Sequence, residues 1–341
     1  MPRVLNFGSL NIDYVYAVPH FVRGGETLAA ASRAVHIGGK GLNQSVSLAR
    51  AGLAPMHAGI IGGDGSFLKG FLAAEGVDVS RVAEMPEEPS GHTFIQVRPE
   101  GENAILYYPG TNERLTEEFV KSTLDGLESG DVLLLQNETN LVDVIIREGL
   151  ARGLRVIFNP APFDEAARRL PLNALHAVVL NQTEAQGLVS EDPDELDRED
   201  AGSALLSGEA LFEAVAAKLP HVTLIITQGA KGAAWRRPSG RAGFTPAFPV
   251  AAVDTTGAGD AFTGYAVRAL VEALAAEDDA RAAGRSQKDA VQAGDDAFAL
   301  GMRLAAMAAA ISVTQHGAAE SIPTLAAAQA ALANADAARS A

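Results

Sequence analysis

The chain has 341 residues, 48% of them hydrophobic, so it can bury a substantial core and wholesale disorder is not expected. It has no cysteine, which excludes disulfides, thiolate catalysis and cysteine-bound zinc. A net charge of −15 with no basic face argues against nucleic-acid and anionic-membrane partners; with no signal-peptide pattern and no apolar run long enough to span a bilayer, we expect a cytoplasmic protein.

Short apolar runs rich in β-branched residues alternate with helical patterns along most of the chain. The runs predict buried strands at 3–8, 131–137, 154–160, 176–181 and 222–229. The amphipathic segments between them predict helices at 42–53, 140–153 and 209–219. Parallel strands covered on both faces have such continuous apolar runs, so we expect a layered α/β fold with a mostly parallel sheet.

Two stretches, 14–39 and 91–110, break this alternation and favour antiparallel strands. The second alternates apolar and polar residues around "PEGEN", a hairpin turn. They predict a small β appendage, either a lid or an edge hairpin without function. Acidic segments at 190–203 and 275–296 are expected to be exposed connections or surface helix, and the Ala-rich tail after Pro323 a terminal helix with fraying ends.

The stretch "DTTGAGDAFTGY" at 254–265 places three small residues before Asp260, where an amphipathic helical pattern begins. Amides in the first turn of a helix lack intrahelical partners and lie at its positive end, so an anion can approach them closely. A carboxylate beside an anion site is reasonable if it accepts a proton from a hydroxyl that attacks the anion. The alternative is that Asp260 only complements the helix dipole while the glycines make a turn.

A second glycine loop, "HIGGKGLNQSVSLARAG" at 36–52, also leads into a helix. Lys40 and Asn43 would project from that helix start, and their donors suit a polyhydroxylated ligand. Asn11 and Asp13 follow the first strand at a period of two, so they share one face. Ligands bind at strand ends in open α/β sheets, and an Asp with an Asn can hold vicinal hydroxyls.

Several common motifs are missing. The lysine of "GGKG" is followed by Gly41, which excludes a Walker-type phosphate loop, and Phe262 replaces the third glycine of a dinucleotide fingerprint. The seven histidines have no metal-ligand spacing, and no G-x-S-x-G elbow occurs. A dinucleotide-dependent oxidoreductase therefore lacks its main signal.

Together, "GGKGLNQSVSLARAG" and "DTTGAGDAFTGY" resemble the two signature regions of the ribokinase-like (PfkB) carbohydrate kinases. Shorter segments resemble that family in the same order and are most similar to its ribokinases: "GSLNID", "GGET", "NPAP", "NQTEA", "TQGAKG" and "HGAAESIP". The resemblance covers nearly the whole chain. It implies a three-layer α/β sandwich with a β lid: a core of 1–13, 38–90 and 111–330, lid strands in 14–37 and 91–110, and a tail at 331–341.

The resemblance implies transfer of the γ-phosphate of ATP to a hydroxyl of a small unphosphorylated sugar, ribose or a related pentose. Asp260 would be the base, and the amides of Gly257, Ala258, Gly259 and Asp260 the anion hole. We expect a low pKa for a carboxylate at a helix start, which is tolerable because the proton moves late in phosphoryl transfer.

Other site residues are also implied by the resemblance. The sugar would contact Asn11, Asp13, Gly39, Lys40, Asn43, Glu138 and Asp260. The nucleotide would contact Asn181, Glu184, Thr227, Gly229 and Gly232, with Mg²⁺ held through water by Asn181 and Glu184. Alternatively, Glu184 is only a helix-start acid. A K⁺ site would involve Asp254, Thr256, Ser312, Gln315, Gly317 and Ser321.

The acceptor stays open at this stage. A hexose, a sugar acid or a nucleoside is an alternative, as is an inactive sugar-binding sensor on the same fold. Asn11 and Asp13 favour an unphosphorylated polyol, because a sugar phosphate would call for extra Arg or Lys. "QNET" and "YYPGTN" depart from a ribose-specific pattern, and 275–296 looks like an insertion. Paired lids in related kinases imply a homodimer.

Overall fold

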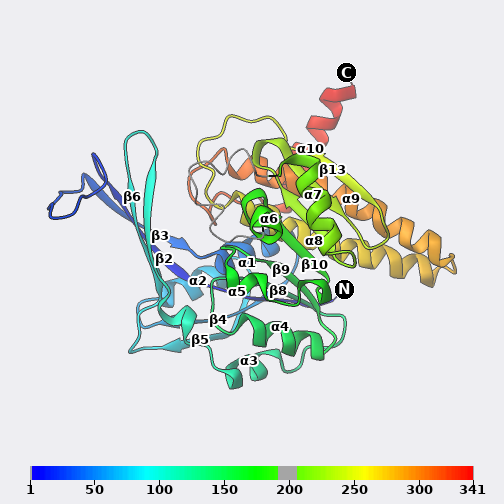
Figure 1. Cartoon of the computed structure of the whole chain (residues 1–341), viewed down its shortest axis with the longest axis horizontal. Helices are drawn as coiled ribbons and strands as arrows, with labels where there is room; N and C mark the ends of the chain where they lie inside the picture. The colour runs from blue at the N-terminus through cyan, green and yellow to red at the C-terminus, as the bar shows by residue number, and fades with distance from the viewer. Residues whose placement is uncertain (1, 191–205, 341) are drawn as a thin grey trace.

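The computed structural model describes residues 2–190 and 206–340, so most of the acidic segment predicted at 190–203 lies outside the described residues. Within those ranges, nine strands form one sheet in the order β13-β12-β11-β10-β9-β8-β1-β4-β5 (Figure 1). Its strands are β1 (Val4–Phe7), β4 (Pro55–Gly62), β5 (Asp78–Met85), β8 (Val132–Gln136), β9 (Arg155–Asn159), β10 (Ala177–Asn181), β11 (Thr223–Thr227), β12 (Gly232–Arg236) and β13 (Ala242–Pro246).

Helices cover both faces of this sheet because its side chains alternate between two cores. In β8, Val132 and Leu134 pack into one core and Leu133 and Leu135 into the other. The first core is covered by α1 (Lys40–Arg50), α2 (Ser66–Ala74), α8 (Ala258–Ala282), α9 (Gln287–Ser312) and α10 (Leu325–Ser340). The second is covered by α3 (Glu117–Leu124), α4 (Val142–Ala151), α5 (Glu165–Arg168), α6 (Gln182–Val189) and α7 (Gly208–Lys218). The predicted three-layer sandwich is confirmed.

The five strands predicted in the core are present, and the sheet extends beyond them at both edges. β4 and β5 continue the parallel sheet on one side, while β12 and β13 add antiparallel strands on the other. The sheet is therefore mostly parallel, as expected. β1 lies between β8 and β4 and is parallel to both, so the carboxyl ends of these three strands lie at the same edge of the sheet. Helix α1 begins at this edge.

A second sheet of four described strands projects from this core, at the left of Figure 1. Its order is β3-β2-β6-β7, formed by β2 (Asn11–Ala17), β3 (Ser32–Gly38), β6 (Gly91–Val97) and β7 (Asn103–Tyr108). Both hairpins are antiparallel, but β2 and β6 pair in parallel and join them, which the pattern did not indicate. The turn predicted around "PEGEN" closes with a bond from the Arg98 amide to the Glu102 carbonyl. The sheet begins at Asn11, so Asn11 and Asp13 belong to it.

The acidic stretch 275–296 forms the end of α8 and the start of α9, a long helical hairpin at the right of Figure 1. It is not wholly exposed, because Asp295 is buried. Asp295 and Glu277 each accept a bond from Arg237, which is itself buried, at 2.8 and 2.9 Å. These ion pairs attach the hairpin to the segment after β12.

The C-terminal helix α10 begins at Leu325 and runs to Ser340, so it includes most of the tail placed at 331–341. Ala328 and Leu332 are buried against the first core, which fixes its first turns. Among the described residues, no helix has the length and apolar character needed to cross a membrane.

Candidate active site

The lid and the core enclose a hollow of about 700 Å³. Its walls come from the lid strands, the start of α1, the loop after β8 and the start of α8. All the residues predicted to hold the sugar line it: Asn11, Asp13, Gly39, Lys40, Asn43, Glu138 and Asp260. Segments that are far apart in the sequence thus meet at one cavity.

A smaller hollow of about 160 Å³ adjoins the first. Its walls include Asn181, Glu184, Thr227 and Gly259, four residues predicted for the nucleotide and anion side. The two hollows share Lys40, Gly257 and Asp260 in their walls. Asp260 therefore lies at the boundary between the place predicted for the acceptor and the place predicted for the phosphates.

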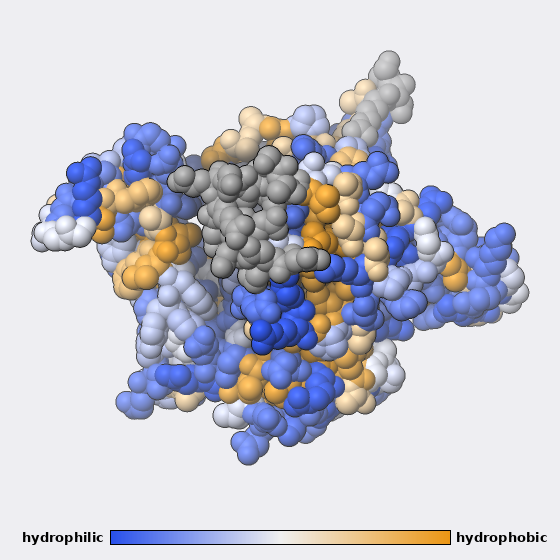
Figure 2. Space-filling view, in the orientation of Figure 1, coloured by the Kyte–Doolittle hydropathy of each residue, from blue (hydrophilic) through white to orange (hydrophobic). Residues whose placement is uncertain are grey.

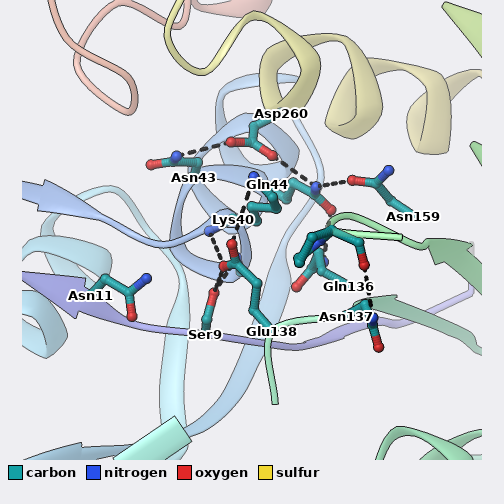
Figure 3. Close-up of polar contacts among 12 residues, drawn as sticks. Ser9, Asn11, Lys40, Asn43, Gln44, Gln136, Asn137, Glu138, Asn159 and Asp260 are labelled. Carbon is teal, nitrogen blue, oxygen red and sulfur yellow. Dashed lines mark hydrogen bonds and ion pairs between the residues drawn. The ribbon is translucent and has the colours of Figure 1, made fainter. Parts of the chain in front are cut away.

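The Asp260 carboxylate is held through both oxygens by α1. Asn43 Nδ2 donates to Oδ2 and Gln44 Nε2 to Oδ1, each at 2.9 Å (Figure 3). The side chain is buried, and burial raises its pKa, although the charge of Lys40 and these hydrogen bonds act in the opposite direction. The expectation of a low pKa was wrong, because at this buried position desolvation outweighs the charge of Lys40 and the hydrogen bonds from Gln44 and Asn43.

Lys40 and Glu138 form the second charged group at the boundary. Lys40 Nζ lies 3.6 Å from Glu138 Oε1, and the other carboxylate oxygen, Oε2, accepts bonds from the Ser9 hydroxyl and the Lys40 amide at 2.5 and 3.0 Å. Burial alone would lower the pKa of Lys40, but the carboxylates of Asp260, Glu138 and Glu184 outweigh it and raise the pKa. Lys40 therefore stays cationic at the junction of the two hollows.

The lid contributes one face of its sheet to the larger hollow. Strand register places Asp13 beside His36 on one neighbour and Thr93 on the other, and Thr93 beside Tyr107. Thr93 donates its hydroxyl to Asp13 Oδ1 at 2.5 Å. Burial raises the pKa of Asp13, and the charge of Glu138 acts in the same direction.

Asn11 is fixed from the core side. Its Oδ1 accepts a bond from Asn112 Nδ2 at 2.7 Å, while Asn112 Oδ1 accepts from the Leu10 amide at 3.1 Å. The amide of Asn11 is therefore directed with its nitrogen away from Asn112.

The first turn of α8 has the small-residue geometry that an anion site needs. Gly257 has a φ of 74°, which favours glycine, and a Cβ there would approach Ala318 Cα to 2.8 Å. At Gly259 a Cβ would meet nothing within 4 Å, so the space beside this backbone is open. The amide of Ala258 donates to the Thr255 carbonyl at 3.3 Å, so one of the four amides predicted for the anion hole already has a partner.

Asn181 and Glu184 form a capping box at the start of α6. The Glu184 amide donates to Asn181 Oδ1 at 2.8 Å, and the Asn181 amide donates to Glu184 Oε2 at 2.9 Å. Glu184 is therefore a helix-start acid, as the alternative held, but burial also raises its pKa to about 7. A buried carboxylate of this kind suits a cation. Among the described residues no group of three His, Cys, Asp or Glu could hold a metal ion. Mg²⁺ is commonly bound by one or two carboxylates together with phosphates and water, and Glu184 could supply such a carboxylate.

The residues predicted for K⁺ come together only in part. Asp254 accepts bonds from the amides of Thr256 and Gly317 at 2.9 and 3.0 Å, so its loop is joined to the segment after α9. The Ser312 and Ser321 hydroxyls donate to nearby carbonyls within their own turns. The backbone N–H of Gln315 likewise donates to the Ser312 carbonyl at 3.2 Å.

Gly229 and Gly232 lie in the turn η5 (Gly229–Lys231) and at the start of β12, outside the described walls of both hollows. Conversely, the sequence reasoning did not select Gln44 or the buried side chains that contact it. Gln136 and Asn159 bond to Gln44, and Asn6 bonds to Gln136. Each is a polar residue at or next to the last position of a mostly apolar strand. The recurrence of a polar residue near the end of three strands was the signal in the sequence that could have identified this buried group.

A buried carboxylate in the shared wall of two hollows, one of them beside the glycine-containing start of α8, is an arrangement that suits phosphoryl transfer between two bound molecules. A match to the family described as "pfkB family carbohydrate kinase" covers residues 1–325. The chain is 34% identical over 321 residues to a ribokinase of Haemophilus influenzae, which covers 93% of this chain and 94% of that protein.

Solved structures agree with this match. A ribokinase from Cryptococcus neoformans in complex with ADP has a TM-score of 0.73 at 30% identity, covering 97% of this chain and 99% of that one. An Arabidopsis thaliana ribokinase complexed with ribose and ATP has a TM-score of 0.72 at 25% identity, with 97% and 98% coverage. The chain belongs to the pfkB family of carbohydrate kinases and is a phosphotransferase.

Proposed function

We propose that the chain transfers the γ-phosphoryl group of ATP to a hydroxyl of a small unphosphorylated sugar, with ribose or a related pentose as the first candidate. The observation that carries the proposal is the shared wall of the two hollows, where Lys40, Gly257 and Asp260 meet. An acceptor in the larger hollow and a triphosphate in the smaller would face each other across Asp260.

Asp260 would orient the attacking hydroxyl and take its proton as the new oxygen–phosphorus bond forms and the bond to ADP breaks. A carboxylate with a raised pKa is a better base than one at an open helix start. Asn43, which bonds Asp260 Oδ2 and lines the same hollow, would lie beside the acceptor. Asn11 and Asp13 would hold further hydroxyls from the lid side.

The start of α8 would receive the transferred phosphoryl group, because Gly259 lines the smaller hollow and leaves open space beside its backbone. Lys40 would balance the charge on the bridging oxygens. Asn181 and Glu184 are the residues that would hold Mg²⁺ through water. When bound, that ion would neutralise phosphate charge.

The charge of the larger hollow favours a neutral acceptor. Lys40 is the one cationic side chain among the described residues that line it, whereas six carboxylates do so: Asp13, Glu113, Glu138, Asp143, Asp164 and Asp260. This balance disfavours a sugar acid or a sugar phosphate. The similarity to ribokinases, one of them solved with ribose and ATP, supports a pentose.

A nucleoside is the second candidate, on account of the size and apolar part of the same hollow. Its volume of about 700 Å³ falls within the range of drug-sized ligand pockets, and a pentose alone would leave much of it unfilled. Ile95, Ile105, Leu141 and Leu170 line it together with Tyr107, and they could cover a base.

A panel of acceptors in a coupled ADP assay tests the proposal. Ribose, 2-deoxyribose, a hexose, a sugar acid and inosine would be compared at equal concentrations with ATP and Mg²⁺. We expect turnover with a neutral pentose and none with the sugar acid. Turnover with inosine alone would favour the second candidate. Measurable sugar binding without ADP production from any acceptor would contradict kinase function and favour a sensor.

A K⁺ site and a homodimer are part of the same proposal. The joined loops around Asp254 and Gly317 support a cation near the anion hole, tested by replacing K⁺ with Li⁺ at constant ionic strength. The lid supports the dimer, because its face opposite the hollow exposes Phe94, Leu106 and Tyr108. The register pairs Phe94 with Leu106, and Tyr108 follows two positions further along β7 on the same face. Figure 2 shows apolar residues gathered on this part of the molecule.

A further inference from the structure

A network of side-chain amides lies beneath the two hollows and connects Asp260 to the interior of the sheet (Figure 3). Gln44 is at its centre. It is fully buried and is not among the described residues that line either hollow. The side chain of Gln44 reaches the walls of the hollows through two hydrogen-bond partners, Asp260, which lines both, and Asn159, which lines the smaller one.

The orientation of the Gln44 amide is fixed by its partners. Its nitrogen Nε2 donates to Asp260 Oδ1 and to Asn159 Oδ1, both at 2.9 Å, which uses both protons. Its oxygen Oε1 accepts from Gln136 Nε2 at 2.7 Å. Turning the amide over would place its oxygen against the carboxylate and its NH₂ group against that of Gln136, so a single orientation satisfies all four groups.

Gln136 is fixed in turn. Its second amide proton goes to Asn6 Oδ1 at 2.9 Å, and Asn6 Nδ2 donates to the Gly41 carbonyl and the Ser45 hydroxyl at 2.7 and 2.9 Å. Gly8 provides room for this arrangement, because a Cβ there would lie 2.1 Å from Gln136 Oε1. The amide that contacts Asp260 is thus held by a chain of saturated donors that reaches into β1 and β8.

We propose that Gln44 is a positioning residue for phosphoryl transfer, whose amide, oriented by Gln136, holds Asp260 in one direction toward the acceptor. Asn43, from the same helix, donates a hydrogen bond to the other carboxylate oxygen of Asp260. The inference rests on the proposed function, since it takes Asp260 to be the group that receives the proton of the attacking hydroxyl.

The charges around Asp260 predict how the loss of Gln44 would change the pKa of Asp260. Lys40 from α1, Glu138 after β8 and Glu184 on α6 face the carboxylate. Burial raises the pKa of Asp260, while Lys40 and the Gln44 hydrogen bond lower it. Removing the Gln44 donor should therefore raise this pKa further and leave less of the base ionised.

The far end of the network adds no competing titration. Ser45 Oγ lies 2.8 Å from His57 Nδ1, and burial lowers the pKa of His57 to about 3. His57 is therefore neutral across the range in which a kinase would be assayed, and a change in the pH profile can be assigned to the site.

The test compares Gln44→Met with Ser47→Ala. Gln44→Met keeps the length of the side chain and removes the donor. Ser47 lies on the same buried face of α1 and bonds the Ala261 carbonyl of α8 at 2.8 Å without touching Asp260. We expect Gln44→Met to lower kcat by about 10-fold to 100-fold with nearly unchanged KM, and to move the acid limb of the kcat profile to higher pH. Ser47→Ala should leave both within about twofold.

Gln44→Glu is the second variant, in case Gln44→Met fails to fold. It keeps the shape of the side chain and the acceptor for Gln136, but places another carboxyl against Asp260. The acid limb should move by about one pH unit or more. An unchanged pH profile in both Gln44 variants, with kcat equal to that of Ser47→Ala, would overturn the positioning role alone. Wild-type protein that produces no ADP with any acceptor would overturn the proposed function as well.

Discussion

Asn43 donates a hydrogen bond of 2.9 Å to Asp260, a residue 217 positions further along the chain. This contact joins the two glycine loops, because one residue belongs to the first turns of α1 and the other to the first turn of α8. The helices pack closely along their length, with Gly264 against Ser47. The walls predicted for the acceptor and for the phosphates are therefore joined through the contact between α1 and α8.

The open space at Gly259 predicts opposite effects on stability and activity. Gly259→Ala adds a methyl group to a helical position with nothing within 4 Å, so the free energy of unfolding should rise by about 0.4–1 kcal/mol. The same methyl group would project beside the backbone of the smaller hollow and displace a bound triphosphate, lowering kcat/KM by about 100-fold. Urea denaturation and the coupled assay measure the two effects.

Gly70→Ala is the matched control for this variant. Gly70 is also helical and also has open space at its Cβ position, but it lies in α2, outside the described walls of both hollows. It should gain similar stability and keep its activity. Equal activity in the two variants would rule out a phosphate position beside Gly259.

The exposed apolar face of the lid predicts a dimer that one charge can break. Leu106 is 69% exposed on β7, and Leu106→Glu should shift the mass seen by sedimentation equilibrium from two chains to one. Leu300→Glu makes the same change at a leucine that is 60% exposed on α9, far from the lid, and should not alter the mass. A wild-type protein that is monomeric at assay concentration would refute the lid dimer.

The buried ion pairs of Arg237 predict a large loss of stability. Arg237→Met would leave buried Asp295 with the Ser239 hydroxyl and Glu277 with Arg281, at a cost of about 3–5 kcal/mol in the free energy of unfolding. Lys121→Met removes the exposed pair with Glu117 and should cost less than about 1 kcal/mol. Denaturation curves that gave both variants the same midpoint would mean that the α8–α9 hairpin is held by packing alone.

Burial of His57 predicts a loss of stability toward acid. Its pKa is about 3 in the folded protein, whereas an unfolded histidine titrates near 6.5. Below about pH 6.5 the unfolded chain binds a proton at this histidine, whereas the folded chain does not. The free energy of unfolding therefore decreases as the pH is lowered, by about 2 kcal/mol at pH 5. His57→Asn should flatten the curve between pH 5 and 7 by this amount, with His221→Asn at an exposed position as the control. An unchanged slope in His57→Asn would show that another group carries the acid sensitivity.

The sequence predicted the layers, and its glycine loops and strand ends indicated Asn11, Lys40 and Asp260 as candidates. Other residues of the walls came only from the resemblance: Glu138, Asn181, Glu184 and Thr227. Gly229 and Gly232, also taken from the resemblance, lie outside the described walls. Asp260, Lys40 and Asn43 could be placed together only through the resemblance, since nothing local brings residues 217 positions apart into contact. The raised pKa of Asp260 could not be predicted, because burial depends on how α1, α8 and the sheet pack. Gln44 could not be predicted for the same reason, because a polar residue near the start of a helix carries no local signal that it will be buried.

Asp260→Asn is the most direct test of the account, because it keeps the shape of the side chain and removes the proton acceptor. We expect kcat to fall by about 100-fold to 10,000-fold, while calorimetry shows ATP and the acceptor binding as in the wild type. Asp143→Asn, which removes a carboxylate from the wall of the same hollow, should cost less than about 10-fold. Near-normal turnover in Asp260→Asn would contradict the claim that this carboxylate, at the boundary of the two hollows, receives the proton of the attacking hydroxyl.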